Sequence, residues 1–384
     1  LIATVPLMLI FATLFAFTTW LERKALARIQ NRIGPNKVGI PCTRIGLFGL
    51  GQPAADGIKM IFKEDIVPRG ADRLFHLLAP ILALIPAMLV LCFLPLDFPW
   101  VNEDSVKAYL LDGAVIFFFA ITGLNTLAVF MAGWASRNKY SLLGGMRAVA
   151  QMVSYEIPLV LSAVIVVMMV GSLNAAEIAK AQTGWDWFVF SPWGFAAFVI
   201  FFIAALAETN RSPFDLPEAE SEIIAGYFTE YSGFKFALFF LGEYIAMFAI
   251  SGLAVTLFLG GGDGPGVTMN LVDQGLPTEA FPGLTVIWFL MKIFALIAVM
   301  IWLRGTLPRL RVDQLMGFAW KFMLPLSILN ILVAGFAWHA EQLGNPFITV
   351  LTWVISLAVL YGAASGLNQL NRPNVRPREY KYAE

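Results

Sequence analysis

Residues 193–259 read WGFAAFVIFFIAALAETNRSPFDLPEAESEIIAGYFTEYSGFKFALFFLGEYIAMFAISGLAVTLFL, two apolar runs joined by an acidic segment. The runs, 193–208 and 236–259, are close to the roughly 20 helical residues that cross a bilayer core. From Glu208 to Glu230 the only cation is Arg211. Because carboxylates this dense beside a bilayer repel one another and lose hydration, we expect them to exchange protons or to meet positive charge on another chain. The acids are Glu208, Asp215, Glu218, Glu220, Glu222 and Glu230.

The rest of the chain repeats this apolar pattern. Of its 384 residues, 59% are hydrophobic and 14% are charged, whereas soluble domains have about 25% charged residues. The apolar runs are continuous rather than alternating, which favours helices over a barrel. We predict an all-α integral membrane protein that forms a single polytopic domain over residues 1–384, with about nine transmembrane helices. Eight are possible, because Pro192 and Pro325 make the first residues of two of these helices hard to locate. The runs are 1–20, 74–96, 110–134, 148–171, 193–208, 236–259, 284–303, 321–338 and 346–367.

Positive charge alternates between successive predicted loops. The loop 21–73 carries ten Lys or Arg residues, and more occur in the third and seventh loops and in the C-terminal tail. The intervening loops together hold only Lys107 and Lys180. Because loops rich in Lys and Arg stay on the cytoplasmic side, we predict the N-terminus outside and the C-terminus inside. The acidic loop then also lies inside.

Two segments of the long inside loop have helical patterns. In LERKALARIQNRIGPNKVGI (21–40), basic residues recur at helical spacing until a Gly-Pro pair ends the helix. In GQPAADGIKMIFKED (51–65), Pro53 suits the first turn of a helix with Ile58 on its apolar face and Lys59 on its polar face. The second pattern indicates either a helix in the membrane interface or an ordinary amphipathic connector.

The sequence offers no cofactor site. His76 and His339 fall on opposite sides of the predicted membrane, which excludes a haem held by both. Cys42 and Cys92 do not have the spacing of a metal site. The Gly-rich run 260–266 lacks the Lys-Ser/Thr of a phosphate loop. We therefore expect no metal, no flavin and no catalytic residue in this chain alone, and no nucleic-acid partner.

Charged residues inside the predicted spans mark further candidates, since a charge at a helix centre costs about 2.5–3.5 kcal/mol on insertion scales. Glu156 and Glu243 lie within spans, and Glu208 ends another. The alternative for Glu156 and Glu243 is a structural ion pair with Lys292. Asp112 is close to a span start, where an interfacial position would explain it.

The acidic loop has two alternative roles. Glu218 and Glu222 are four residues apart, so on a helix they would share a face and repel. With Glu220 and Asp215 nearby, we expect raised and mutually coupled pKa values, and protons shared across the cluster. That suits a proton relay. The alternative is a solvated loop that docks onto a basic partner, and both roles are compatible.

Four motifs together resemble one family. They are LERKALARIQNRIGPNKVG (21–39), QPAADGIKMIFKED (52–65), GGMRAVAQMVSYEIPL (144–159) and AETNRSPFDLPEAESEIIAGYFTEYSG (207–233). From about residue 20 to about residue 325 the chain is similar to the H-type membrane component of proton-pumping NADH-quinone oxidoreductase, the respiratory complex I family. The apolar run after residue 346 and the basic tail are more like bacterial members than shorter mitochondrial ones.

The resemblance implies an enzyme subunit of a bacterial or mitochondrial inner membrane. Such a component anchors the hydrophilic arm to the membrane arm, helps form the chamber where ubiquinone is reduced, and couples reduction to proton translocation. Its partners are the other subunits of both arms, ubiquinone and membrane lipid, with FMN and iron–sulfur clusters in partner subunits. The implied quinone-path residues are Glu22, Arg23, Asp56, Arg211, Asp215 and Arg304. The implied proton-coupling residues are Glu156, Glu208, Glu218, Glu220, Glu222, Glu230 and Glu243.

Three other kinds of membrane protein are alternatives to this function. The related membrane subunit of energy-converting hydrogenases shares the scaffold but passes electrons to protons rather than to quinone. A secondary transporter would show paired, inverted halves, and none is visible. A pure anchor would need none of the acids for coupling.

Overall fold

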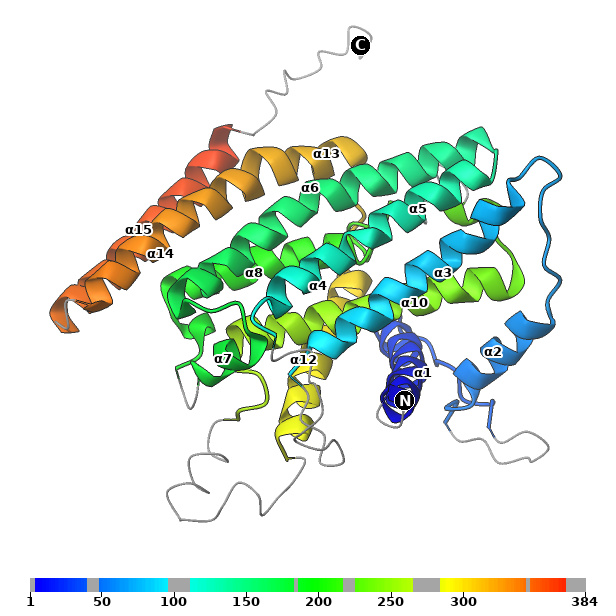
Figure 1. The fold of residues 1–384 in the computed structure, drawn as a ribbon, viewed down its shortest axis with the longest axis horizontal. Helices are drawn as coiled ribbons and strands as arrows, with labels where there is room; N and C mark the ends of the chain where they lie inside the picture. Colours follow the sequence, from blue (N-terminus) through cyan, green and yellow to red (C-terminus); the bar gives the residue numbers. More distant parts are fainter. Residues whose placement is uncertain are drawn as a thin grey trace, which may run out of the picture.

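The computed structural model describes residues 4–39, 48–95, 111–182, 186–216, 225–264, 284–342 and 346–370, and every regular element within these ranges is a helix (Figure 1). The prediction of an all-α protein is confirmed. Short 3-10 turns are η1 (Leu91–Phe93), η3 (Phe188–Phe190) and η4 (Gly226–Glu230), and η6 (Ala319–Met323) is a π-helical turn. The α-helices are α1 (Thr4–Ile29), α2 (Gln52–Phe62), α3 (Arg73–Val90), α4 (Ala114–Thr122), α5 (Leu124–Ala135), α6 (Lys139–Val170), α7 (Ala175–Lys180), α8 (Pro192–Glu208), α10 (Gly233–Phe258), α12 (Leu284–Thr306), α13 (Val312–Phe318), α14 (Leu324–Gln342) and α15 (Pro346–Leu370).

Seven helical stretches in the described ranges are long and apolar enough to cross a membrane. α8 is apolar but shorter, at 17 residues. α1 includes most of the first predicted run, 1–20, and continues to Ile29. The total of nine spans stays a prediction. The seven stretches are Arg73–Phe93, Ala114–Ala135, Lys139–Val170, Gly233–Phe258, Leu284–Thr306, Val312–Ala340 and Val350–Leu367.

Some helices differ from the predicted runs, and the clearest cases are α6 and the pair α4 and α5. α6 begins at Lys139 rather than at residue 148, because the Asn138 side chain caps it by accepting from the backbone N–H of Tyr140 at 3.0 Å. The first turns of α6 are polar, so hydropathy alone placed the start too late. The predicted run 110–134 is divided at Gly123 into α4 and α5.

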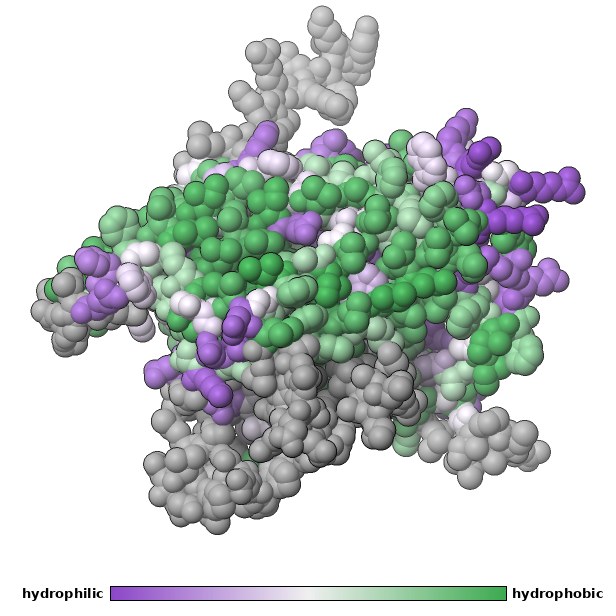
Figure 2. Space-filling view, in the orientation of Figure 1, coloured by the Kyte–Doolittle hydropathy of each residue, from purple (hydrophilic) through white to green (hydrophobic). Residues whose placement is uncertain are grey.

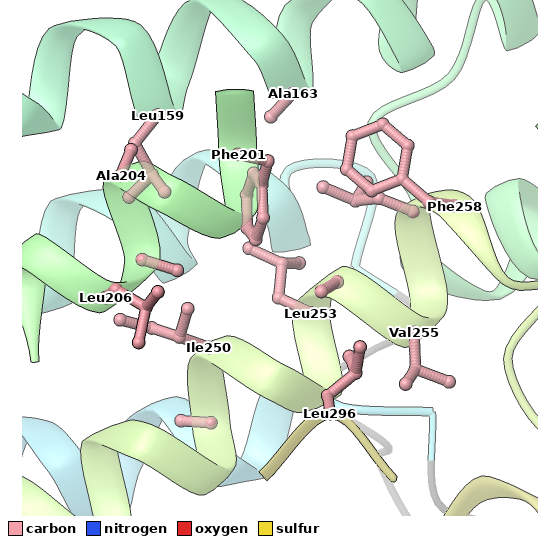
Figure 3. Close-up of a cluster of buried hydrophobic side chains, with 14 of the residues drawn as sticks. Leu159, Ala163, Phe201, Ala204, Leu206, Ile250, Leu253, Val255, Phe258 and Leu296 are labelled. Atoms are coloured by element: carbon pink, nitrogen blue, oxygen red, sulfur yellow. The ribbon is translucent and has the colours of Figure 1, made fainter. Parts of the chain in front are cut away.

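The core lies where α6, α8, α10 and α12 meet. Side chains from these four helices point toward one another in Figure 3, and they include fully buried Phe201 of α8 and Phe258 of α10, whose ring centroids are 5.6 Å apart. Small residues let backbones come close at the edge of this bundle: a Cβ at Gly144 of α6 would lie 2.5 Å from the Cα of Gly226 in η4. The core therefore fixes α8, which carries Glu208 at its C-terminal end.

The surface has the character of a membrane protein. Figure 2 shows hydrophobic residues over the middle of the bundle, with many hydrophilic residues at the end where α5 meets α6. α2 lies beside α1, has no buried residue, and exposes 62% of Ile61 and 85% of Phe62. The amphipathic helix predicted at 51–65 is therefore present, and its apolar face is exposed.

Candidate functional site

A buried cluster of charge forms around Glu22, which lies near the C-terminal end of α1 and is 4% exposed. Arg211 Nη1 donates to Glu22 Oε1 at 3.2 Å and to Oε2 at 3.4 Å. Arg304, at the end of α12, also donates from Nη1 to Glu22 Oε1. One carboxylate thus holds two guanidinium groups from distant parts of the chain, and the three quinone-path candidates Glu22, Arg211 and Arg304 meet.

Tyr244 of α10 completes this cluster. Its hydroxyl donates to Glu22 Oε2 at 2.6 Å, and the guanidinium carbon of Arg211 lies 4.1 Å from the centre of its ring. Burial would lower the pKa of Arg211, but the charge of Glu22, together with Tyr244 and Glu243, raises it above its usual value. Arg211 therefore stays charged although it is only 7% exposed. Its Nε and Nη2 atoms have no acceptor in the described protein.

The turn that carries Arg211 is held by Gln151 of α6, which is fully buried. Gln151 Nε2 donates to the carbonyls of Ala207 and Phe214, each at 2.7 Å. The N–H of Leu310 also donates to the carbonyl of Pro213 at 3.2 Å. Because both sides of the turn are tied, Arg211 is fixed in place rather than carried on a free loop.

The other quinone-path candidates pair at the margin of the cluster. Arg23, next to Glu22, is half exposed and binds Asp56 of α2 at 2.7 Å. Asp215 binds Arg309 at 3.4 Å. The adjacent residues Glu22 and Arg23 thus face opposite ways, one toward the buried arginines and one toward α2.

Glu208 and Glu156 form a second centre. Glu208 is 6% exposed, and its Oε2 atom has no hydrogen-bond partner in the described protein. It borders a cavity of about 20 Å³ between α3, α4, α5, α8 and α10, together with Asn125 and Thr122. That volume is enough for one water molecule, since a water needs about 10–15 Å³ measured in this way.

Glu156 approaches Glu208 from α6. It is the charged group that acts electrostatically on Glu208. A Cβ at Gly123 would lie 3.2 Å from Glu156 Oε1, so the carboxylate rests against the break between α4 and α5. The break therefore makes room for an acid inside the bundle.

Two more predicted acids bond to neutral groups. Glu243 Oε1 accepts from the Tyr227 hydroxyl at 3.2 Å, and Glu243 also lies within electrostatic range of Arg211. Glu230 Oε1 accepts from Asn138 Nδ2 at 2.7 Å. Glu243 thus stands between the Glu22 cluster and the turn that ends in Glu230. The remaining predicted acids, Glu218, Glu220 and Glu222, lie outside the described residues.

The alternative of an ion pair between Lys292 and Glu156 or Glu243 is wrong. Lys292 Nζ donates to the carbonyls of Leu259 at 2.5 Å and Gly261 at 2.9 Å, and also to that of Asp263. It thereby closes the C-terminal end of α10, where carbonyls lack partners within the helix. The acids of the bundle are therefore not neutralised by this lysine.

His76 lies near the N-terminal end of α3. It is fully buried, and its ring stacks on Tyr231 with centroids 4.1 Å apart. Asp112, by contrast, is exposed, as an interfacial residue would be.

Two site residues were missed from the sequence. Tyr244 directly follows Glu243, and a hydroxyl inside a span needs a partner, so the signal was present. Gln151 lies in the motif that contains Glu156, and a carboxamide in an apolar run is a similar signal.

A multi-pass helical membrane protein with a carboxylate–diarginine cluster and separate buried carboxylates belongs to the class that handles charge within the membrane. The model of the NADH dehydrogenase family matches residues 2–335, and the chain belongs to this family. Its relatives include proteins named as the H component of NADH-quinone oxidoreductase. The one from Geobacillus kaustophilus (strain HTA426) is 47% identical over 328 residues, which cover 85% of this chain and 90% of the relative. The one from Dehalococcoides mccartyi (strain CBDB1) is 46% identical over 344 residues, covering 89% and 87%. In Koribacter versatilis (strain Ellin345), the H component numbered 2 is 44% identical over 348 residues, covering 87% and 95%.

Proposed function

We propose that this chain is the membrane subunit of a proton-translocating NADH:quinone oxidoreductase that forms part of the quinone chamber and couples quinone reduction to proton translocation. Its family membership, the names of its relatives and its apolar helices support this function. As one polytopic domain over residues 1–384, it would anchor the hydrophilic arm to the membrane arm.

The proposal includes partners and an orientation. FMN and the iron–sulfur clusters would belong to partner subunits, ubiquinone is the substrate, and lipid surrounds the helices. The membrane is a bacterial inner membrane or the mitochondrial one, with the N-terminus outside and the C-terminus inside. The distribution of Lys and Arg among the loops supports the orientation.

The observation that carries the proposal is the Glu22 cluster. A quinone takes up two electrons and two protons to become a quinol, so negative charge develops on its oxygens before protonation is complete. Arg211 keeps two donor atoms without acceptors in the described protein and remains charged when buried. Preorganised cations of this kind stabilise developing negative charge. In this proposal Arg211 and Arg304 interact electrostatically with the charge that develops on the quinone. Arg23, Asp56 and Asp215 line the inner side of the quinone path.

The buried acids would carry the coupling inward. Glu243 is within electrostatic range of Arg211, and Glu208 and Glu156 interact beside a cavity that has room for one water. A change of charge near Arg211 would act on Glu243 first, and a water molecule in the cavity would pass a proton to Glu208. Glu218, Glu220, Glu222 and Glu230 would belong to the same path.

The test is the reaction of the purified complex that contains this chain. With NADH as donor, it should reduce a short-chain quinone, and its lipid extract should contain quinone. Arg211→Gln should lower quinone reduction strongly while NADH oxidation by a soluble acceptor persists, because only the quinone step uses this cluster. Hydrogen evolution without quinone reduction would instead establish the hydrogenase-like alternative.

A further inference from the structure

We propose that Asn125 is a positioning residue for proton transfer, which holds one water molecule against the carboxyl group of Glu208. This inference rests on the proposed coupling function and adds to it the residue that places the water. Thr122, Asn125 and Glu208, with the cavity of about 20 Å³ that they border, are called the water site below. The described residues that line this cavity include none of the quinone-path residues.

Two polar side chains of the water site come from the break between α4 and α5. Thr122 ends α4, Gly123 separates the two helices, and Asn125 lies in the first turn of α5. The Thr122 hydroxyl donates to the carbonyl of Phe119 at 3.0 Å, and its oxygen is still able to accept. The carboxamide of Asn125, in contrast, forms no hydrogen bond with any residue that the structure describes. Because an unpaired polar group inside an apolar bundle is costly, we expect its partner to be a bound molecule.

Glu208 supplies the opposite side of the water site. It lies at the C-terminal end of α8 and is 6% exposed, and its Oε2 atom is without a hydrogen-bond partner in the described ranges of the chain. The carboxyl group of Glu208 and the carboxamide of Asn125 border the same cavity. A buried polar atom that lacks a partner costs free energy, so one water between the two groups would satisfy both.

The size and the polarity of the water site fit a single water molecule. A volume of about 20 Å³ exceeds the roughly 10–15 Å³ that one water needs. Buried waters make about three hydrogen bonds, and three groups border this cavity: Glu208 Oε2, the Asn125 carboxamide and Thr122 Oγ1. The other described residues of the lining are apolar, and they are Pro86, Ala87, Val90, Ala246, Ala249 and Ile250.

A carboxamide is suited to hold this water because it has both an acceptor oxygen and donor N–H groups. When Glu208 is ionised, the water donates to Oε2, and when Glu208 is protonated, the water accepts from the carboxyl O–H. Asn125 offers the matching group in either orientation. A proton that the water gives to Glu208 is replaced by one from a neighbouring acid, so the water is regenerated. Asn125 thus orients the water without titrating itself.

The break between α4 and α5 also approaches Glu156. A Cβ at Gly123 would lie 3.2 Å from Glu156 Oε1, and Glu156 acts electrostatically on Glu208. One short segment therefore approaches Glu156 at its glycine and borders the cavity of Glu208 at its asparagine. A water held by Asn125 is placed next to the acids on which the proposed coupling depends.

The structural test is a density map of the intact complex at a resolution that shows ordered waters. The wild type should contain one water within hydrogen-bond distance of Glu208 Oε2 and the Asn125 side chain. Asn125→Leu, which is similar in size but apolar, should remove this water. Ala249→Val, which fills the cavity from α10 and keeps both polar groups, should also remove it. A wild-type map without this water, or a water that remains in both variants, would overturn the proposal.

The functional test is the number of protons translocated per electron in proteoliposomes. Asn125→Leu and Ala249→Val should lower this ratio, and Asn125→Ser, which restores a hydroxyl, should recover it. Because the first two variants act from different helices, either one decides the result if the other fails to assemble. Thr126→Val is the control, since the Thr126 hydroxyl donates to the carbonyl of Gly123 at 2.6 Å and Thr126 is outside the described lining of the cavity.

An unchanged ratio in Asn125→Leu, or an equal loss in Thr126→Val, would overturn the positioning role, because the first would show that the water is not needed and the second that the break as a whole matters. A wild-type complex that translocates no protons would contradict the proposed function and with it the role in proton transfer. The wild-type density tests the water site alone, so the two failures are distinguishable.

Discussion

Arg211 lies with its guanidinium 4.1 Å from the ring centre of Tyr244, and both side chains bond to the same carboxylate, Glu22. The ring limits one face of the cation and the hydroxyl helps to fix its counter-ion. Since Arg304 bonds to the same carboxylate, α1, α10, α12 and the turn after α8 are joined at one point. We expect variants at this point to affect stability and quinone reduction together.

Glu22→Gln should strongly impair the complex. It leaves Arg211 and Arg304 beside each other without a counter-charge, and removing one partner of a buried pair costs about 3–5 kcal/mol. The measurement is the amount of assembled complex and its thermal stability. The matched control is Asp56→Asn, which breaks the half-exposed pair with Arg23 and should cost at most about 1 kcal/mol. Equal effects of the two variants would contradict the role given to Glu22.

Tyr244→Phe should reduce quinone reduction without preventing assembly. The ring under Arg211 remains, but Glu22 loses a hydrogen bond of 2.6 Å, and bonds to charged groups contribute about 1.5–3 kcal/mol. Steady-state kinetics with varied quinone should show a fall in kcat/KM of about tenfold. Tyr231→Phe is the control, because the Tyr231 hydroxyl has no partner in the described structure. A larger effect of Tyr231→Phe would refute the role given to Tyr244.

Gly144→Ala should disturb the packing of α6 against η4. The added Cβ would lie 2.5 Å from the Cα of Gly226 and 2.9 Å from its carbonyl carbon, and overpacking costs about 1–3 kcal/mol or more. Thermal inactivation of the complex measures this. Gly362→Ala in α15 meets open space within the chain, so it should leave stability unchanged or slightly raised. Normal stability of the Gly144 variant would show that the two backbones separate easily.

Lys292→Met should loosen the end of α10. Methionine has a similar length but cannot donate, so the carbonyls of Leu259, Gly261 and Asp263 lose a shared donor. Leaving buried groups unsatisfied costs about 1–3 kcal/mol each. Proteolysis between α10 and α12 should become faster. Lys180→Met, at an exposed lysine of α7, should not change the rate, and unchanged cleavage in both variants would refute the capping role.

The membrane-spanning helices were predictable because each one coincides with a long apolar run in the sequence. Their boundaries were less so where polar first turns are capped, as at Asn138, or where Gly123 divides a continuous apolar run. The mean hydropathy of a sequence window indicates neither a capped polar turn nor a division at glycine. The amphipathic α2 was predictable because Ile58 and Lys59 occupy opposite faces of the helix.

The buried site was predictable in its charges but not in its connections. Glu22, Arg211 and Arg304 were each singled out, yet nothing in the sequence shows that residues so far apart share one carboxylate. The same holds for Lys292, whose nearest oxygens are helix-end carbonyls rather than acids. Contacts of this kind depend on how the helices pack, which no local pattern encodes.

The coupling of quinone reduction to proton movement through buried acids is tested most directly by the number of protons translocated per electron in proteoliposomes. The complex with Glu208→Gln should assemble and still reduce quinone but translocate fewer protons per electron, because the amide cannot take up a proton beside the cavity. Glu177→Gln, an exposed acid of α7, should keep the full ratio. A Glu208→Gln complex with an unchanged ratio would contradict this coupling role.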